Sequence, residues 1–195
     1  MNVRIKGLML GNSFFILAGS ILVPVYALFS ASIGAGVELA GLLFATKFVA
    51  NAFADLIVLG IKDRVDFTEL VYKLSMAVRG AAWIYLGLFP SIQSLLIVQI
   101  ITGLAEGFGT PAFSSLFADS LDRNKHMKEW AIWDLIKNPL IAVGSALSGW
   151  LVANSSFEML FYIMGTLAII GSFIPIRRVS VASASKKYKA KAPRR

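Results

Sequence analysis

Residues 7–29 read GLMLGNSFFILAGSILVPVYALF, and none of these 23 residues carries a charge. At about 1.5 Å per residue, a helix of this length crosses the roughly 30 Å hydrocarbon core of a bilayer. A cleaved signal peptide would have a shorter apolar core and a small-residue cleavage site, and it stays the alternative interpretation of this run. We predict that residues 7–29 form a retained first membrane-spanning helix.

The rest of the chain has the same apolar character. The sequence is 57% hydrophobic and 15% charged, whereas soluble domains are about 45–50% apolar and about 25% charged. Further apolar stretches run at about 38–61, 70–89, 92–118, 129–153 and 157–176, separated by segments with turn or polar residues. The pattern predicts an all-α polytopic membrane protein, a bundle of six transmembrane helices within a domain of residues 1–178.

Lysine and arginine residues occur in alternate connections between the predicted spans. They precede the first span and follow the second, the fourth and the last, whereas the other three connections contain none. Outside the predicted spans and before Arg177, the basic residues are Arg4, Lys6, Lys62, Arg64, Arg123, Lys125 and Lys128. Because short cytoplasmic loops carry an excess of Lys and Arg, both termini are predicted to be cytoplasmic. The expected location is the cell (inner) membrane.

Residues 179–195 form a basic tail rich in Ser, Ala and Lys. This composition cannot bury enough apolar surface to fold alone, so we predict a disordered cytoplasmic tail. The tail either binds anionic lipids of the cytoplasmic leaflet or serves only as a topology determinant. The net charge of +8 would suit nucleic acid, but much of the excess lies in this tail, and no nucleic-acid partner is expected.

Several predicted spans carry polar or ionisable side chains at mid-depth. A charge there costs at least about 2.5–3.5 kcal/mol, so such residues usually face a protein interior or a water-filled pathway. Helical spacing puts many of them on shared stripes. The candidate substrate or ion-pathway residues are Lys47, Asn51, Asp55, Arg79, Gln99, Glu106, Asp134 and Lys137. Weaker stripes in the first and third spans contain Asn12, Gly19, Tyr26, Tyr72 and Trp83.

These candidates include three bases and three acids, so each ion can find an opposite partner. Two interpretations follow: fixed ion pairs that hold a bundle together, or groups that line a translocation path and bind a polar substrate or protons. In the second, Glu106 is the candidate for contact with a proton or a cation, whereas Lys47, Arg79 and Lys137 would suit an anionic or polar substrate. Asp55 lies nearest the cytoplasmic end of its span.

Glycines and prolines within the spans predict close packing and bends. Gly7/Gly11 and Gly103/Gly107 have the GxxxG spacing that lets two helices approach closely. Pro24, Pro111 and Pro139 lie inside or near predicted spans, where proline removes a backbone hydrogen bond and kinks a helix.

The sequence offers little for catalysis. It contains no cysteine, and its one histidine, His126, lies in a charged loop. The glycines of residues 103–109 fall inside an apolar span and not after a strand, which disfavours a nucleotide loop. We therefore expect no enzyme activity, no metal site and no cofactor.

Residues 99–111, QIITGLAEGFGTP, resemble the glycine-rich fourth helix of the major facilitator superfamily of secondary transporters. Residues 144–149, GSALSG, are similar to a thin version of the family's fifth-helix glycine motif. Asp63 and Arg64 fall in the loop where the family carries an Asp-Arg signature, and Gln99 stands where the family often has arginine. The resemblance covers about residues 7–176 and implies the six-helix N-terminal half of such a transporter.

The resemblance implies proton-coupled secondary transport of a small polar solute by alternating access. Halves of these transporters are parallel repeats about an axis along the membrane normal. A six-helix chain would therefore pair with a second copy as a homodimer, pair with a separate six-helix half, or be a truncated relic. The alternative function is a non-transporting membrane scaffold or accessory subunit.

Overall fold

The computed structural model describes residues 3–61, 65–122 and 124–176, and all regular structure in these segments is helical. Two predictions lie outside the described residues: the Asp63 and Arg64 loop signature and the basic tail from residue 179.

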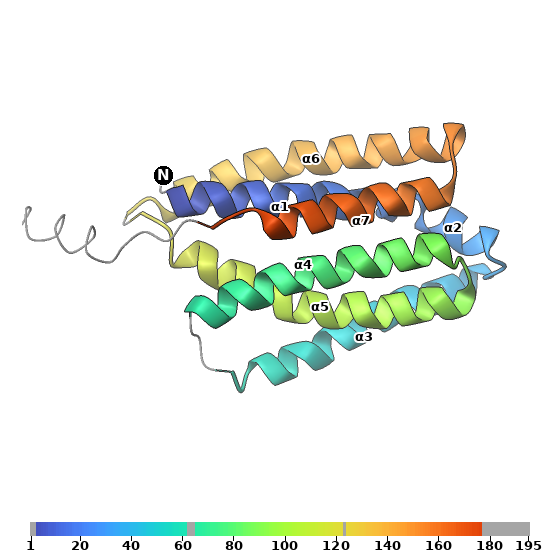
Figure 1. Cartoon of the computed structure of the whole chain (residues 1–195), viewed down its shortest axis with the longest axis horizontal. Helices are drawn as coiled ribbons and strands as arrows, with labels where there is room; N and C mark the ends of the chain where they lie inside the picture. Colours follow the sequence, from blue (N-terminus) through green and yellow to red (C-terminus); the bar gives the residue numbers. More distant parts are fainter. Residues whose placement is uncertain (1–2, 62–64, 123, 177–195) are drawn as a thin grey trace, which may run out of the picture.

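The helices reproduce the six predicted spans (Figure 1). The first span consists of α1 (Val3–Leu22), the 3₁₀ helix η1 (Val23–Val25) and α2 (Tyr26–Ser32). The others are α3 (Val37–Val58), α4 (Val65–Leu88), α5 (Ile92–Ala118), α6 (His126–Asn154) and α7 (Phe157–Phe173). The 3₁₀ turn includes Pro24, which lacks the N–H that a continuous α-helix uses.

Length and composition qualify four of these spans to cross a membrane by themselves. They are Val3–Ser32, Val37–Val58, Ile92–Ala118 and His126–Asn154, and α7 is a shorter apolar helix. The third predicted span, α4, contains Glu69, Lys73 and Arg79, and these charged residues lower its mean hydropathy. It packs against α5 and α7 as a full member of the bundle. The prediction of an all-α membrane protein is confirmed.

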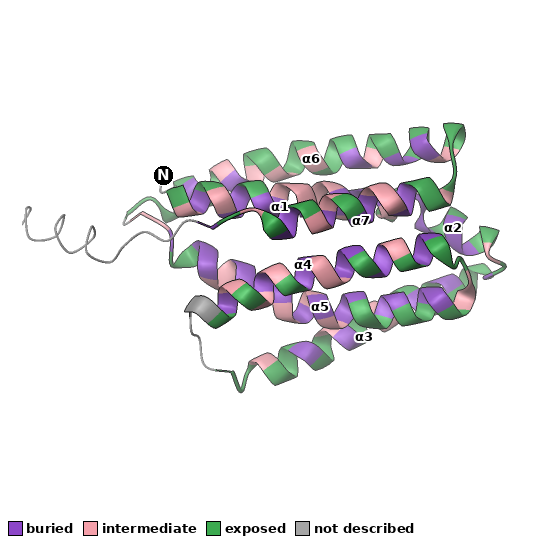
Figure 2. Cartoon of the chain, in the orientation of Figure 1, coloured by how far each residue is buried: buried purple, intermediate pink, exposed green. Residues whose placement is uncertain are grey.

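The six spans pack in the spatial order α3, α5, α4, α7, α1, α6, each against the next. This order matches the first three spans with the last three, so that α1 corresponds to α5, α3 to α6 and α4 to α7. The contact of α3 with α5 then corresponds to the contact of α6 with α1, and the contact of α4 with α7 corresponds to itself. This is the order expected of two inverted three-helix repeats. The helices at the two ends of the series, α3 and α6, are the least buried of the four long spans, and α6 is largely exposed in Figure 2.

Several helix crossings are close enough to require glycine, among them those of α3 with α5, of α4 with α7 and of α1 with α7. At the α3–α5 crossing, a Cβ atom on Gly103 would lie 2.9 Å from the Ala50 Cβ, and one on Gly107 would lie 2.6 Å from the Asn51 carbonyl oxygen. At the α4–α7 crossing, Gly80 and Gly165 face each other equally closely. The GxxxG spacing predicted the first crossing, whereas single glycines gave no signal for the second.

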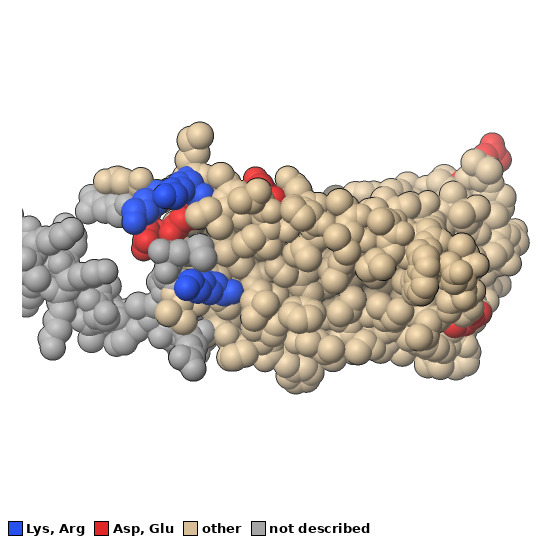
Figure 3. Space-filling model, turned by 90° about the horizontal axis from the view of Figure 1, so that it is seen from above, with Lys and Arg blue, Asp and Glu red and all other residues tan. Residues whose placement is uncertain are grey.

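The described basic residues gather at one end of the bundle in the face that Figure 3 shows. The same end holds the start of α1, the end of α3, the start of α4, the end of α5 and the start of α6 (Figure 1). The middle of that face carries neither basic nor acidic side chains, as expected for a surface in contact with lipid.

Candidate functional site

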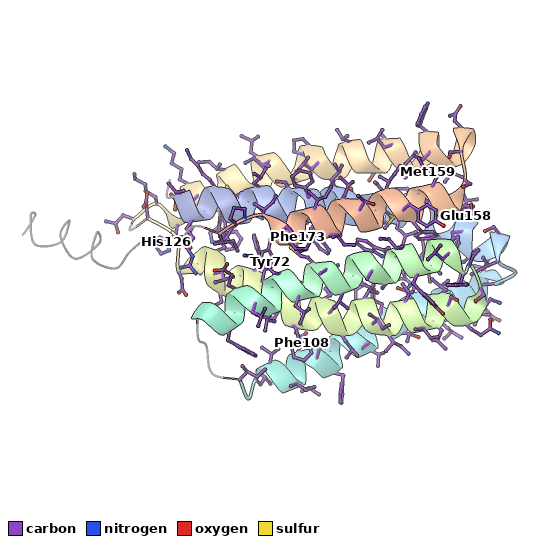
Figure 4. The ribbon with its side chains drawn as sticks, viewed as in Figure 1. Tyr72, Phe108, His126, Glu158, Met159 and Phe173 are labelled. Carbon is purple, nitrogen blue, oxygen red and sulfur yellow. The ribbon has the colours of Figure 1, made fainter. Side chains whose placement is uncertain are left out.

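The cavities between the helices of the described bundle include two of different character. The larger, about 730 Å³, is lined by α3, α4, α5 and the residues that follow α3, and none of its lining side chains is ionisable. Phe108, labelled in Figure 4, belongs to its wall. The smaller, about 390 Å³, is bounded by α1 to α5, with Ile141 of α6 at its edge. We place the candidate site in the smaller cavity, called here the polar cavity, because charged side chains from three helices meet there.

Glu106 on α5 is the centre of this charged cluster. Its Oε2 atom accepts a hydrogen bond from Arg79 Nη2 of α4 at 2.9 Å. The same oxygen lies 2.8 Å from Lys47 Nζ of α3. Arg79 is the most enclosed of the three, with 10% of its side chain exposed, against 25% for Glu106 and 23% for Lys47. With all three groups ionised, the cluster carries one net positive charge.

The close approach of α3 and α5 brings Lys47 to Glu106. The backbone of Lys47 packs directly on Gly103, which lies three residues before Glu106 on the same helix. A side chain at position 103 would hold the two backbones apart. The GxxxG pair therefore allows Lys47 to come within ion-pair distance of the Glu106 carboxylate.

Aromatic rings hold Arg79 in place. The guanidinium carbon lies 3.9 Å from the centroid of the Phe15 ring, which is a close cation–π contact. Phe15 also stacks on Trp83, with 6.0 Å between ring centroids and 17° between their planes. The ring contact and the Glu106 carboxylate together limit the positions that the guanidinium can adopt.

A second polar chain links three helices across the polar cavity. Gln99 Nε2 donates a hydrogen bond to the Tyr26 hydroxyl at 3.0 Å, and that hydroxyl donates to the Ala40 carbonyl at 3.3 Å. Gln99 and Tyr26 are both buried. Buried polar groups with satisfied partners fix the relative positions of the helices that carry them.

Half of the eight predicted pathway residues line the polar cavity: Lys47, Arg79, Gln99 and Glu106. Asn51 does not line the cavity and lies where α3 packs on Gly107.

Three predicted residues lie elsewhere. Asp55 is exposed on α3. Asp134 and Lys137 form an ion pair on α6, with 2.6 Å between Lys137 Nζ and Asp134 Oδ1, and neither lines the cavity. Helical spacing shows which residues share a stripe, but the tertiary packing decides which stripe faces the cavity.

The prediction missed several neutral residues that line the same cavity. Asn12, Tyr26, Tyr72 and Trp83 all do so, and they were visible in the sequence as weaker stripes in the first and third spans. Phe15 gave no sequence signal, because one phenylalanine among many in an apolar span is typical of lipid contact or core packing.

The comparisons with known proteins agree with this architecture. A family model described as "Major Facilitator Superfamily" matches residues 8–194. The chain belongs to the major facilitator superfamily. Members of this family are transporters, and six helices in this arrangement correspond to one half of such a transporter. The predicted resemblance is confirmed.

One curated relative is the "Fatty acid resistance protein FarB" of Neisseria gonorrhoeae. It is 26% identical over 155 residues, a match that covers 80% of this chain. The match covers 30% of that relative, so the compared region is a minor part of the longer protein.

Proposed function

We propose that this chain is a secondary active transporter, or half of one, that moves a small polar solute by alternating access. The observation that carries the proposal is the Lys47–Glu106–Arg79 cluster. Three helices bring it into a cavity inside an apolar bundle, although charges at mid-depth are costly. A transporter needs such a site, because a polar solute must exchange its hydration for protein groups partway across the membrane.

Glu106 is the proposed coupling residue. One oxygen of its carboxylate holds Lys47 on α3 and Arg79 on α4 at the same time. A proton on Glu106 removes the negative charge that attracts both cations, which loosens α3 from α4 and α5. Protonation of Glu106 therefore selects between an arrangement in which its carboxylate links α3 and α4 and one in which it does not. Alternating access requires two such states.

The other wall of the proposed transport site comes from a second six-helix unit. Asp55, Asp134 and Lys137 lie on α3 and α6, the two ends of the packing series, where they are half-exposed or exposed. Charges are costly against lipid, so a protein surface that covers these helices would stabilise the bundle. The unit is a second copy of this chain or another six-helix half. The chain lies in the cell (inner) membrane, and both of its termini face the cytoplasm.

A non-transporting scaffold is the second candidate. It is favoured by the fact that the charges of the cluster pair with one another, as fixed packing elements also do. The two candidates differ in hydration, because only a transporter requires water and solutes to reach Glu106.

Uptake into liposomes tests the proposal. The name of the FarB relative refers to fatty acids, so a radiolabelled short-chain fatty acid, which is still a small polar solute, is the first cargo to test in reconstituted protein with an imposed proton gradient. Gradient-driven uptake should exceed that of empty liposomes, and Glu106→Gln should abolish the stimulation by the gradient. Glu69→Gln is the matched control, since Glu69 pairs with Lys73 one turn away and lies outside the polar cavity. Equal stimulation in the wild type and Glu106→Gln would remove Glu106 from the coupling role.

A further inference from the structure

The polar cavity has more hydrogen-bond donors than its own acceptors use. Lys47 and Arg79 are the two cations among its described lining residues, and Glu106 is the one acid. Both cations bind the same oxygen of that acid. The cavity therefore keeps one net positive charge and several N–H groups that a single carboxylate does not satisfy.

Two buried donors at this site lack a partner among the described residues. They are Nε of Arg79 and the hydroxyl of Tyr72, in side chains belonging to residues that are 8% and 3% exposed. A buried donor without a partner costs about 1–3 kcal/mol. Tyr72 and Arg79 are seven residues apart on α4 and thus share a face, and Tyr72 lies on the side of α4 toward α1 and α7 (Figure 4).

We infer that the solute is an anion with an apolar body, and that Lys47, Arg79 and Tyr72 bind its negative group. This inference rests on the proposed transport function and specifies its substrate class. An anion both neutralises the excess charge and accepts hydrogen bonds from the unpartnered donors, whereas a neutral ligand can only accept hydrogen bonds and a cationic ligand adds to the positive charge. The remaining walls carry the rings of Phe15, Phe44, Trp83 and Phe113, which suit an apolar body.

The same charges link anion binding to proton uptake. While Glu106 is ionised, its carboxylate competes with the ligand for Lys47 and Arg79. A proton on Glu106 raises the cluster from one to two positive charges and releases both cations to the ligand. Because linkage is reciprocal, an anion bound at the cations also favours the proton on Glu106. One proton and one monoanion then bind together with no change in net charge.

The other groups that face Glu106 in the cavity are consistent with this linkage. Lys47 comes from α3 and Arg79 from α4, and the tyrosine hydroxyls are those of Tyr26 and Tyr72. No further Asp, Glu, Lys, Arg or His lines the cavity among the described residues. A pH dependence of anion binding would therefore be assigned to Glu106.

Binding of three matched ligands tests the inference without relying on transport. The probes are 4-phenylbutyrate, 4-phenylbutanamide and 4-phenylbutylamine, titrated by calorimetry into the full chain in nanodiscs at mildly acidic and mildly alkaline pH. We expect the carboxylate to bind at least about tenfold more tightly than the amide, and more tightly at acidic pH. Glu106→Gln should bind the carboxylate with high affinity at both pH values.

Variants separate the anion site from general effects on the fold. Lys47→Met should weaken carboxylate binding at least about tenfold, and Tyr72→Phe should weaken carboxylate binding severalfold. Lys47→Arg should keep the preference for the carboxylate over the amide. Lys73→Met is the control outside the cavity and should bind as the wild type does. Circular dichroism and size-exclusion chromatography check that each variant is folded.

Several results would overturn the inference: equal affinity for the carboxylate and the amide, tightest binding of the amine, or no binding of the carboxylate. Selective carboxylate binding without any uptake in liposomes would contradict the transport function and support the anion site. Proton-driven uptake that does not distinguish the three probes would support the transport function and overturn the anion site.

Discussion

Arg79 shows most clearly what individual residues contribute to the site. It reaches Glu106 across 27 positions of sequence, contacts Phe15 on a third helix and is buried. The sequence predicted that Arg79, Lys47 and Glu106 each face a polar interior, because a charge in an apolar span needs a partner. It could not predict that both bases share one carboxylate, since pairing depends on how three helices pack.

Replacing Arg79 by glutamine should destabilise the bundle. The change removes the enclosed partner of Glu106 and the cation that packs on Phe15, so we expect a loss of about 3 kcal/mol, the lower end for breaking a buried pair. Arg79→Lys should cost less, because it keeps the charge and loses the planar contact. Lys73→Met, which breaks a one-turn pair with Glu69, should cost about 0.5 kcal/mol.

Thermal unfolding in detergent, followed by circular dichroism, measures these differences. The expected order of midpoints is wild type, Lys73→Met, Arg79→Lys and Arg79→Gln, from highest to lowest. If Arg79→Gln unfolded at the same temperature as Lys73→Met, Arg79 would not stabilise the cluster.

At the scale of the helix, length and apolar runs were enough to predict all six spans. The start of α4 and the start of α6 come earlier than predicted, because apolar patterns mark only the part in lipid and a helix can continue beyond it. Lys47 and Asn51, which helical spacing put on one stripe, lie on the side of α3 that meets α5, but Asp55, one turn further on, is exposed.

Gly103→Leu should separate α3 from α5. Even a Cβ atom at this position would meet the Lys47 backbone and the Ala50 side chain, so the larger residue forces the helices apart and costs about 1–3 kcal/mol. The shift also moves Lys47 away from Glu106, so proton-stimulated uptake should fall together with the unfolding midpoint.

Gly149→Leu on α6 is the matched control for this change. A Cβ atom there meets nothing of this chain within 4 Å, so the unfolding midpoint should stay near that of the wild type. Equal behaviour of Gly103→Leu and Gly149→Leu would show that the α3–α5 approach does not position the cluster.

At the scale of the whole molecule, the order of the helices could not be derived from composition or periodicity. Six apolar spans allow many arrangements, and only the family resemblance implied a half-transporter. The structure adds that α3 and α6 stand at the two ends of the packing series and carry charged residues. This placement explains why three predicted pathway residues lie outside the polar cavity, on faces proposed to meet a second six-helix unit.

The central claim is that water and solutes reach the polar cavity inside the bundle. The chain contains no cysteine, so a single introduced thiol reports on one position. Thr110 is exposed and lines the cavity on α5, whereas Ala168 is buried in the core and Ile170 is exposed on α7 outside the cavity. The net positive charge at Lys47, Glu106 and Arg79 should also attract anionic reagents.

The most direct measurement is therefore the rate at which membrane-impermeant thiosulfonate reagents modify Thr110→Cys, Ala168→Cys and Ile170→Cys in folded, reconstituted protein. We expect rapid modification of Thr110→Cys, faster with an anionic than with a cationic reagent, and little modification of the other two. A Thr110→Cys protein that is folded and reacts as slowly as Ala168→Cys would contradict the account.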